Sequence, residues 1–156
     1  MKKNSFIPIL VLSLLLLLVI SACKDDKVSP EEQAKIDRAL IEEYVAANSL
    51  NGQFTASGLY YIITKEGSLG SPNLSSTVTV NYAGKLLNGT PFDSGQGISF
   101  ALSGVIQGWQ EGIRLLKKGG AGTLIIPSGL AYGPSGRSTI PANAVLYFDV
   151  DLLDFN

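Results

Sequence analysis

The sequence contains no histidine, and this absence excludes more chemistry than any residue type that is present. Without histidine the chain has neither a Ser-His-Asp nor a Cys-His catalytic arrangement, and it has no histidine-ligated metal site. It also has a single cysteine, so an internal disulfide and a thiolate zinc site are both excluded. We therefore expect no metal centre in this protein.

An excess of positive charge and phosphate-binding motifs are also missing. The chain has 12 basic and 13 acidic residues, for a formal net charge of −1, which leaves no basic footprint for nucleic acid. Its 17 glycines form neither G-x-x-x-x-G-K-S/T nor G-x-G-x-x-G, the motifs that cradle phosphates. We therefore expect no nucleic-acid partner.

The longest apolar run lies near the N-terminus, at residues 6–20, and follows the positively charged pair Lys2 and Lys3. A charged start and a short apolar run are typical of a signal peptide, and a membrane span needs about 20 apolar residues. The run is followed by a junction that ends at Cys23 and resembles a bacterial lipoprotein signal. This resemblance implies removal of residues 1–22 and attachment of lipid to Cys23.

Two alternatives to lipidation remain open: an ordinary export signal and an N-terminal anchor helix, each with an incidental Cys23. Lipidation explains a lone thiol in an exported chain, and several acyl chains give a stable anchor. Residues 23–29 would then be a lipidated polar tether, and the acidic pair after Lys24 resembles signals for the cell surface. We expect a lipid-anchored protein of the bacterial cell envelope, at the outer membrane on its periplasmic or surface side.

A helix is predicted directly after this tether. Ser29 is a typical N-cap, Pro30 suits the first helical position, and Glu32 completes a capping box. The helix should run to Ala47 and rest on the domain through a stripe of apolar residues, Ile36, Leu40, Ile41, Tyr44 and Val45. We interpret residues 30–57 as a packing helix and linker, because one such helix offers little area for a spacer or dimerisation stem. A monomer is expected.

The remaining residues, 58–156, predict one domain of short strands. Runs rich in branched and aromatic residues lie at 59–64, 77–87, 123–126 and 144–153, and Asn88-Gly89 is a strong hairpin signal. One helix is predicted within this region, at 108–118. A single helix laid across an antiparallel sheet gives an α+β fold.

Alternation within the strands predicts which side chains face that helix. The inward set is Val78, Val80 and Tyr82 on one strand and Leu146, Phe148, Val150 and Leu152 on another. Asp149 and Asp151 then share the outer face with Tyr147. We interpret these two carboxylates as part of a solvated strand face and not as an acid–base pair.

Five ordered motifs between Val80 and Val150 together resemble the FKBP-type peptidyl-prolyl cis-trans isomerases, and the match covers roughly residues 58–156. The motifs are Val80-Asn81-Tyr82-x-Gly84, Gly89-Thr90-x-Phe92-Asp93-Ser94, Val105-Ile106-x-Gly108-Trp109-x-x-Gly112, Ala131-Tyr132-Gly133 and Ile140-Pro141-x-Asn143-Ala144-x-Leu146-x-Phe148-Asp149-Val150. The resemblance implies an antiparallel sheet wrapped around one short helix, with a prolyl pocket between them. It also implies proline-containing polypeptide substrates and catalysis without a cofactor.

The resemblance assigns a role to each residue of the pocket. Trp109 would be the floor under the proline ring, Ile106 would offer its backbone N–H, and Tyr132 would offer its hydroxyl to substrate carbonyls. The implied catalytic residues are Tyr82, Asp93, Trp109 and Tyr132. The implied substrate-binding residues are Phe92, Ile98, Val105, Ile106, Ile140 and Phe148.

This chemistry agrees with the missing histidine. An X-Pro bond is polarised by resonance when planar, so an apolar pocket favours the twisted state and no proton has to move. The sequence departs from the family where Ser94 to Ile98 contains no arginine to pair with Asp93, and where Arg137 replaces a common histidine. These departures leave an alternative open, a membrane-tethered chaperone or protein-binding module with little turnover.

Overall fold

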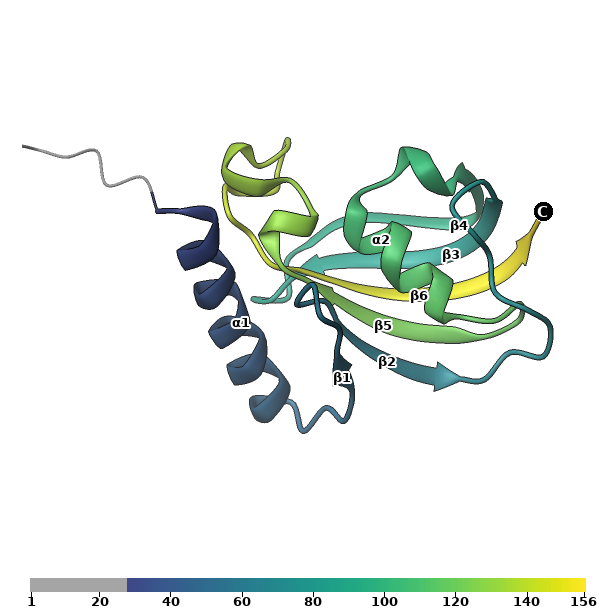
Figure 1. Cartoon of the computed structure of the whole chain (residues 1–156), viewed down its shortest axis with the longest axis horizontal. Helices are drawn as coiled ribbons and strands as arrows, with labels where there is room; N and C mark the ends of the chain where they lie inside the picture. The colour runs from purple at the N-terminus through teal and green to yellow at the C-terminus, as the bar shows by residue number, and fades with distance from the viewer. Residues whose placement is uncertain (1–27) are drawn as a thin grey trace, which may run out of the picture.

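The computed structural model describes residues 28–156 and shows a six-stranded antiparallel sheet in the order β1-β2-β5-β6-β3-β4. The helices and strands are α1 (Pro30–Ala47), β1 (Gln53–Phe54), β2 (Tyr60–Lys65), β3 (Thr77–Leu86), β4 (Pro91–Ala101), α2 (Gln107–Gly112), β5 (Ala121–Ile126) and β6 (Leu146–Phe155). Short 3₁₀ turns lie at Leu102–Gly104, Ile113–Leu115, Ser128–Leu130 and Gly133–Ser135. Helix α2 crosses the sheet and α1 stands beside one end of it (Figure 1), so the predicted α+β class is confirmed.

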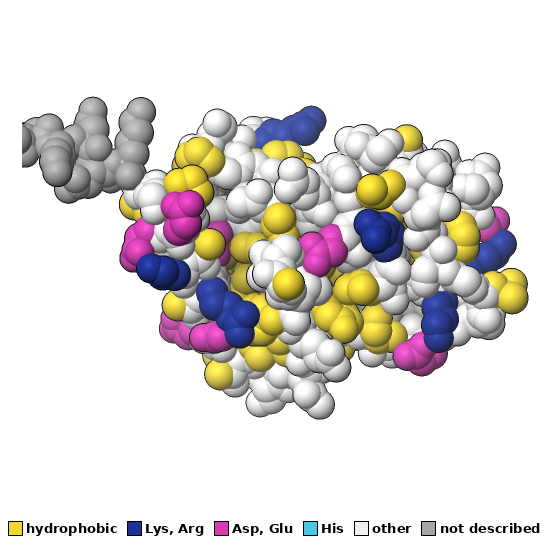
Figure 2. Space-filling view, in the orientation of Figure 1, with side chains coloured by type: hydrophobic (Ala, Val, Ile, Leu, Met, Phe, Trp, Pro, Cys, Tyr) yellow, Lys and Arg dark blue, Asp and Glu magenta, His cyan; other side chains and the backbone are white. Residues whose placement is uncertain are grey.

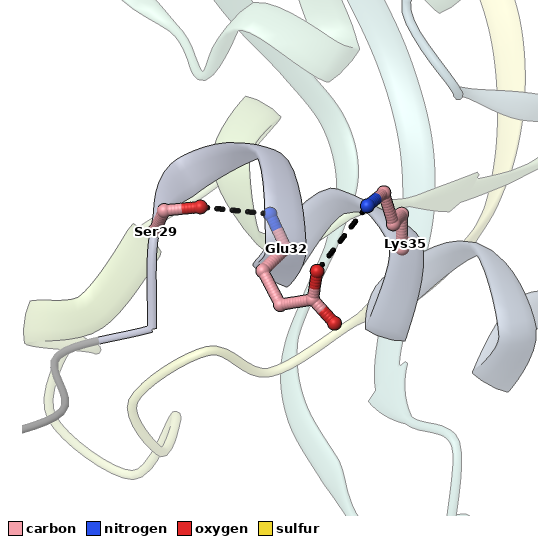
Figure 3. Close-up of polar contacts among 3 residues, drawn as sticks. All are labelled: Ser29, Glu32 and Lys35. Carbon is pink, nitrogen blue, oxygen red and sulfur yellow. Dashed lines mark hydrogen bonds and ion pairs between the residues drawn. The ribbon is translucent and has the colours of Figure 1, made fainter.

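The N-terminal helix begins where its capping signal predicts. The Ser29 hydroxyl oxygen accepts the Glu32 backbone N–H at 3.1 Å, and Pro30 is the first helical residue (Figure 3). The Glu32 carboxylate pairs with Lys35 at 3.3 Å, so only half of the predicted capping box is formed. Charged side chains gather along this helix in the space-filling view (Figure 2), as expected for a helix with one face in solvent.

The face that α1 turns toward the domain differs from the predicted stripe. Ile41 is fully buried as expected, but Ile36 and Leu40 are 41% and 42% exposed. Asp37 is buried in their place and accepts two hydrogen bonds from Ser128. The prediction is wrong at Ile36 and Leu40 because a polar anchor remote in sequence sets the rotation of the helix.

The two faces of the sheet carry separate apolar clusters. The larger packs α2 against the sheet and includes the buried residues Leu59, Val78, Val80, Leu102, Trp109, Ile113, Leu116, Leu124, Ile126, Ile140, Leu146, Phe148, Val150 and Leu152. The smaller lies under α1 and contains Ile41, Tyr60, Ile125, Val145 and Tyr147. The predicted inward face of β6 is therefore confirmed, and so is the burial of Val78 and Val80 on β3.

The outer face of β6 is only partly solvated. Asp149 and Asp151 are exposed as expected, and Asp149 accepts hydrogen bonds from Thr123 at 2.8 Å and from Tyr147 at 3.0 Å. Tyr147 itself is only 9% exposed, because α1 covers it and the Tyr44 ring packs against it edge-on at 5.9 Å. Tyr147 therefore lies on the outer face of β6, as alternation predicts, but α1 shields it from solvent.

Two elements differ in extent from the prediction. Helix α2 ends at Gly112, six residues before the predicted end at 118, and continues as the 3₁₀ turn Ile113–Leu115. Strand β4 was not among the predicted strands, since its middle, Asp93 to Gly97, has weak strand propensity. Long-range pairing with β3 forms the strand in spite of its composition, with register shifts that mark bulges.

Other predictions fall outside the described residues. The signal peptide at 1–22, the lipidation residue Cys23 and most of the tether are among them. Within residues 28–156, no helix combines the length and apolar character needed to cross a membrane. The same residues contain no group of three or more acidic, cysteine or histidine side chains placed to hold a metal ion.

Candidate active site

A cavity of about 380 Å³ opens between α2, the adjacent strands and the loop that follows β5. It is lined by nine of the ten pocket residues expected from the sequence: Tyr82, Phe92, Asp93, Val105, Ile106, Trp109, Tyr132, Ile140 and Phe148. The remaining one, Ile98, is 41% exposed and lies outside the cavity lining. The cavity therefore brings together residues from β3, β4, β6, α2 and two loops.

Trp109 is the buried base of this cavity. Its side chain is 4% exposed, and the rings of Tyr82, Phe148 and Phe100 stand nearly perpendicular to it at centroid distances of 5.1, 5.3 and 5.7 Å. Edge-to-face pairs of this kind contribute about 0.5–1.5 kcal/mol each beyond the burial of their area. The result is an aromatic box whose floor is the indole.

A glycine in α2 brings this floor close to the sheet. Gly108 is buried against β5, and a Cβ at this position would lie 2.9 Å from Cδ1 of Ile126 and closer still to its Cγ2. The helix can approach β5 only because position 108 has no side chain. Trp109, the next residue, is thereby held at the base of the cavity.

A second glycine makes room for the aromatic walls. A Cβ on Gly84 of β3 would lie 2.7 Å from the Phe148 ring and 2.8 Å from the Phe92 ring. Those two rings pack edge-to-face at 5.4 Å across this point. The backbone of β3 thus leaves space that Phe92 and Phe148 fill.

Asp93 is held at the edge of the cavity by hydrogen bonds. The Tyr82 hydroxyl donates to one carboxylate oxygen at 3.1 Å, and the Ser94 backbone N–H donates to the other at 2.9 Å. Burial raises the pKa of the Tyr82 hydroxyl, and the hydrogen bond to Asp93 and its negative charge raise that pKa further. Tyr82 therefore remains a protonated donor across the physiological range.

This raised pKa predicts how stability depends on alkaline pH. Because folding raises this pKa, the folded state keeps the Tyr82 proton in a range above pH 10.0 in which the unfolded chain loses it. The resulting contribution to the free energy of unfolding is complete below pH 10.0 and is lost as pH rises through the raised pKa. Tyr82→Phe removes the contribution. We expect denaturant midpoints, measured at about pH 8 and about pH 11, to fall less in the variant than in the wild type. An equal fall in both proteins would contradict the raised pKa.

The opposite side of the cavity is formed by the loop between β5 and β6. Tyr132 follows the turn Ser128–Leu130, and the Arg137 guanidinium lies 5.5 Å from the centre of the Tyr132 ring. Arg137 and Ile140 are joined by two backbone hydrogen bonds of 2.9 and 2.8 Å, which close a small turn. Arg137 and Asp93 are the charged side chains of the cavity lining, and they come from the loop between β5 and β6 and from β4.

Several lining residues were missed by the site prediction. They are Phe100, Gly104, Ser138 and Thr139, while Arg137, which the sequence marked as a departure from the family, also lines the cavity. Phe100 could have been found from its position two residues after Ile98 on the same face of β4, if β4 itself had been predicted. Ser138 and Thr139 belong to a loop whose path has no local sequence signal.

Ile98 misses the cavity because of its place on the edge strand. It pairs with Val80, whereas Tyr82 pairs with Gly95, so β4 carries an extra residue between these two positions. The Ile98 side chain lies beside Gly95, next to the Tyr82 ring. Ile98 is thus next to a lining residue without lining the cavity itself, and its substrate-binding role stays a prediction.

The site is an aromatic box between one short helix and a wrapped antiparallel sheet, in a chain that contains no histidine. Residues 70–153 match the family described as FKBP-type peptidyl-prolyl cis-trans isomerase. The chain belongs to this family, and the resemblance stated from its motifs is confirmed.

Named relatives and solved structures agree with this membership. The FKBP-type peptidyl-prolyl cis-trans isomerase FkpA of Aeromonas hydrophila is 42% identical over 141 residues, which are 83% of this chain and 53% of that protein. FkpA of Escherichia coli K12 is 39% identical over 140 residues, 82% of this chain and 52% of that protein. The chain thus spans about half the length of these curated relatives.

The fold is also shared with solved structures. The crystal structure of FkpA from Escherichia coli aligns with a TM-score of 0.71 and 41% identity, over 81% of this chain and 62% of that one. A peptidyl-prolyl cis-trans isomerase from Pseudomonas syringae aligns with a TM-score of 0.69 and 27% identity, over 82% of this chain and 96% of that one. The second alignment shows a solved chain matched by this one along almost its whole length.

Proposed function

We propose that this protein is a peptidyl-prolyl cis-trans isomerase that acts on X-Pro bonds of extracytoplasmic polypeptides. The observation that carries the proposal is the aromatic box around Trp109, which opens to solvent beside the hydrogen-bonded pair Tyr82 and Asp93. A proline ring is apolar and compact, so it matches a cavity of about 380 Å³ with an indole floor.

The reaction requires rotation about one amide bond, with a barrier of about 18–20 kcal/mol. Resonance polarises the planar amide more than the twisted one, so transfer into an apolar box costs the planar state more. An acceleration of about 10⁴- to 10⁶-fold corresponds to about 5–8 kcal/mol of selective stabilisation. Catalysis of this kind needs no proton transfer, which agrees with a chain that lacks histidine.

Each pocket residue has a proposed role in this reaction. Trp109 supports the proline ring, the Ile106 backbone N–H and the Tyr132 hydroxyl donate to substrate carbonyls, and Asp93 faces the turning amide. The site supports these roles because Ile106, Tyr132 and Asp93 line one cavity around the indole. Ile106 precedes the first residue of α2, so its N–H is not used within that helix.

The proposal is tested by measuring prolyl isomerisation in a short X-Pro peptide with the purified protein. We expect the rate to rise in proportion to protein concentration, far above the buffer rate. The rival function, a binding module with little turnover, predicts saturable binding of the peptide and a rate equal to buffer. That rival is motivated by Asp93, which has no basic ion-pair partner within residues 28–156.

We also propose that the protein is anchored by lipid at Cys23 in the bacterial cell envelope, at the outer membrane. The support is the apolar run at residues 6–20, the junction ending at Cys23, and the absence of any other cysteine from the chain. The relatives named above are bacterial proteins. The same proposal places the domain on the periplasmic or the surface side of the outer membrane.

Replacing Cys23 with alanine should abolish incorporation of a palmitate probe. The reason is that the thiol is the attachment point for the acyl chain. The measurement is probe labelling of the expressed chain. Asp25→Ala serves as the matched control, since it alters the tether and leaves the thiol. Labelling that persists in Cys23→Ala would overturn the anchor.

A further inference from the structure

Helix α1 carries a buried carboxylate that the pocket itself does not use. Asp37 is 1% exposed, and one of its oxygens accepts the Ser128 backbone N–H at 2.7 Å and the Ser128 hydroxyl at 2.6 Å. The other oxygen accepts the Gln33 side-chain amide at 2.7 Å. Ser128 is also 1% exposed. Hydrogen bonds to a buried carboxylate are among the stronger ones in proteins, and losing one leaves a charge unsatisfied.

Ser128 is the second residue of the loop that carries Tyr132 into the cavity, and the first of the turn Ser128–Leu130. The path between them is a tight turn, in which Leu130 N–H donates to the Pro127 carbonyl at 3.0 Å and Ala131 N–H donates to the Ser128 carbonyl at 3.0 Å. These hydrogen bonds restrict the backbone between Ser128 and Tyr132. We therefore expect a displacement of Ser128 to displace Tyr132 as well.

The other end of this loop also rests on α1. After the loop the chain enters β6 through Val145 and Tyr147, which pack with Ile41 in the smaller apolar cluster. Figure 1 shows α1 standing next to the helical turns of this loop, at the opposite end of the sheet from the C-terminus. Both ends of the loop are thus in contact with the helix.

Apolar packing is thin where α1 meets the start of the loop. A hollow of about 780 Å³ is lined there by Pro30 and Gln33 of the helix and by Pro127 and Leu130 of the loop. Because this space is open, the hydrogen bonds of Asp37 make the direct connection between helix and loop. The contact depends on polar geometry that a small chemical change can remove.

We propose that α1 positions the prolyl pocket, and that Asp37 is the positioning residue, holding Ser128 so that the Tyr132 hydroxyl faces the substrate carbonyl. This inference rests on the proposed function. Asp37 touches no residue of the aromatic box, so it acts through the loop. In this proposal α1 positions the loop that carries Tyr132, in addition to packing on the outer face of the sheet.

The experiment compares kcat/KM of the full chain carrying Asp37→Asn, Tyr132→Phe and both changes. Asparagine keeps the shape of Asp37 but removes its charge, so the two hydrogen bonds from Ser128 to one oxygen are weakened, and an NH2 group replaces the oxygen that accepts from Gln33. We expect Tyr132→Phe to lower kcat/KM about tenfold, and Asp37→Asn to lower it by no more than that, about three- to tenfold. In the Asp37→Asn background, Tyr132→Phe should have less than about a twofold further effect, since the hydroxyl is already misplaced.

A matched control comes from the next residue of the helix. Arg38→Ala removes a guanidinium that lies 3.3 Å from the centre of the Phe54 ring, so it loosens α1 without touching Ser128. We expect it to lower the thermal midpoint and to leave kcat/KM within about twofold of wild type, measured well below that midpoint. If Asp37→Asn and Tyr132→Phe prove fully additive, or if Arg38→Ala lowers kcat/KM as much, the helix stabilises the fold only and the inference fails.

Two further measurements keep the inference falsifiable. Ser128→Ala removes one donor and keeps the backbone bond, so it replaces Asp37→Asn if that variant does not fold, and it should lower kcat/KM about threefold.

A proline-containing peptide is also titrated by Trp109 fluorescence, the only tryptophan signal of the chain. A wild type that binds but does not catalyse contradicts the proposed function alone. Unchanged peptide affinity in Asp37→Asn would then contradict the positioning role.

Discussion

Replacing Trp109 with alanine should abolish measurable prolyl isomerisation and lower the free energy of unfolding by about 3–5 kcal/mol. The indole is 4% exposed, and three aromatic rings pack against it in edge-to-face geometry. Truncation therefore leaves a void in place of the surface that the proline ring would contact. The measurements are kcat/KM with an X-Pro peptide and a urea unfolding curve followed by circular dichroism.

Trp109→Phe is the matched control for this change. The indole Nε1 is buried and is the only buried side-chain nitrogen or oxygen without a hydrogen-bond partner among residues 28–156. Phenylalanine therefore removes ring area without breaking a hydrogen bond, and we expect measurable activity and a smaller loss of stability, about 1–2 kcal/mol. Folded Trp109→Ala protein with wild-type kcat/KM would rule out the indole as the catalytic floor.

Replacing Gly108 with alanine should cost about 1–3 kcal/mol of stability and lower kcat/KM about tenfold or more. Alanine favours a helix over glycine by about 1 kcal/mol, but here its methyl group would overlap the Ile126 side chain on β5. The clash outweighs the propensity because the helix has to move away from the sheet. Trp109 moves with it and the floor of the cavity shifts.

The control for Gly108→Ala is Gly129→Ala, at an exposed position where a Cβ has no neighbour within 4 Å. This variant should match the wild type in stability within about 0.5 kcal/mol. Both proteins are compared by their denaturant midpoints and by kcat/KM at one temperature well below either midpoint. Stabilisation of Gly108→Ala by its helix propensity would show that α2 can move without cost, against the packing described above.

Much of the fold follows from local signals that the sequence carries. Ser29 and Pro30 predict the start of α1 because capping is a property of adjacent residues, and the strands follow from runs of branched and aromatic residues. Tyr82 and Trp109 were predicted to face one pocket, and both line it. Alternation along the strand placed Tyr82 on the face toward α2, and the family resemblance assigned Trp109 to the pocket.

The failures occur where distant segments decide the outcome. Strand β4 forms from residues of weak strand propensity because β3 pairs with it, and the extra residue near Gly95 moves Ile98 out of the cavity. Helix α1 buries Asp37 and exposes Ile36 and Leu40 because Ser128, far along the chain, donates two hydrogen bonds to that carboxylate. A bulge and a long-range hydrogen bond leave no periodic trace in a sequence.

The sequence by itself determined the family, the aromatic composition of the pocket and the exclusion of histidine and thiolate-zinc chemistry, because these depend only on which residues are present and in what order. Only the tertiary structure decided that α1 is joined to the pocket loop through Asp37 and Ser128. The physical reason is that a buried charge is placed by the donors around it, and those donors are brought together only by folding.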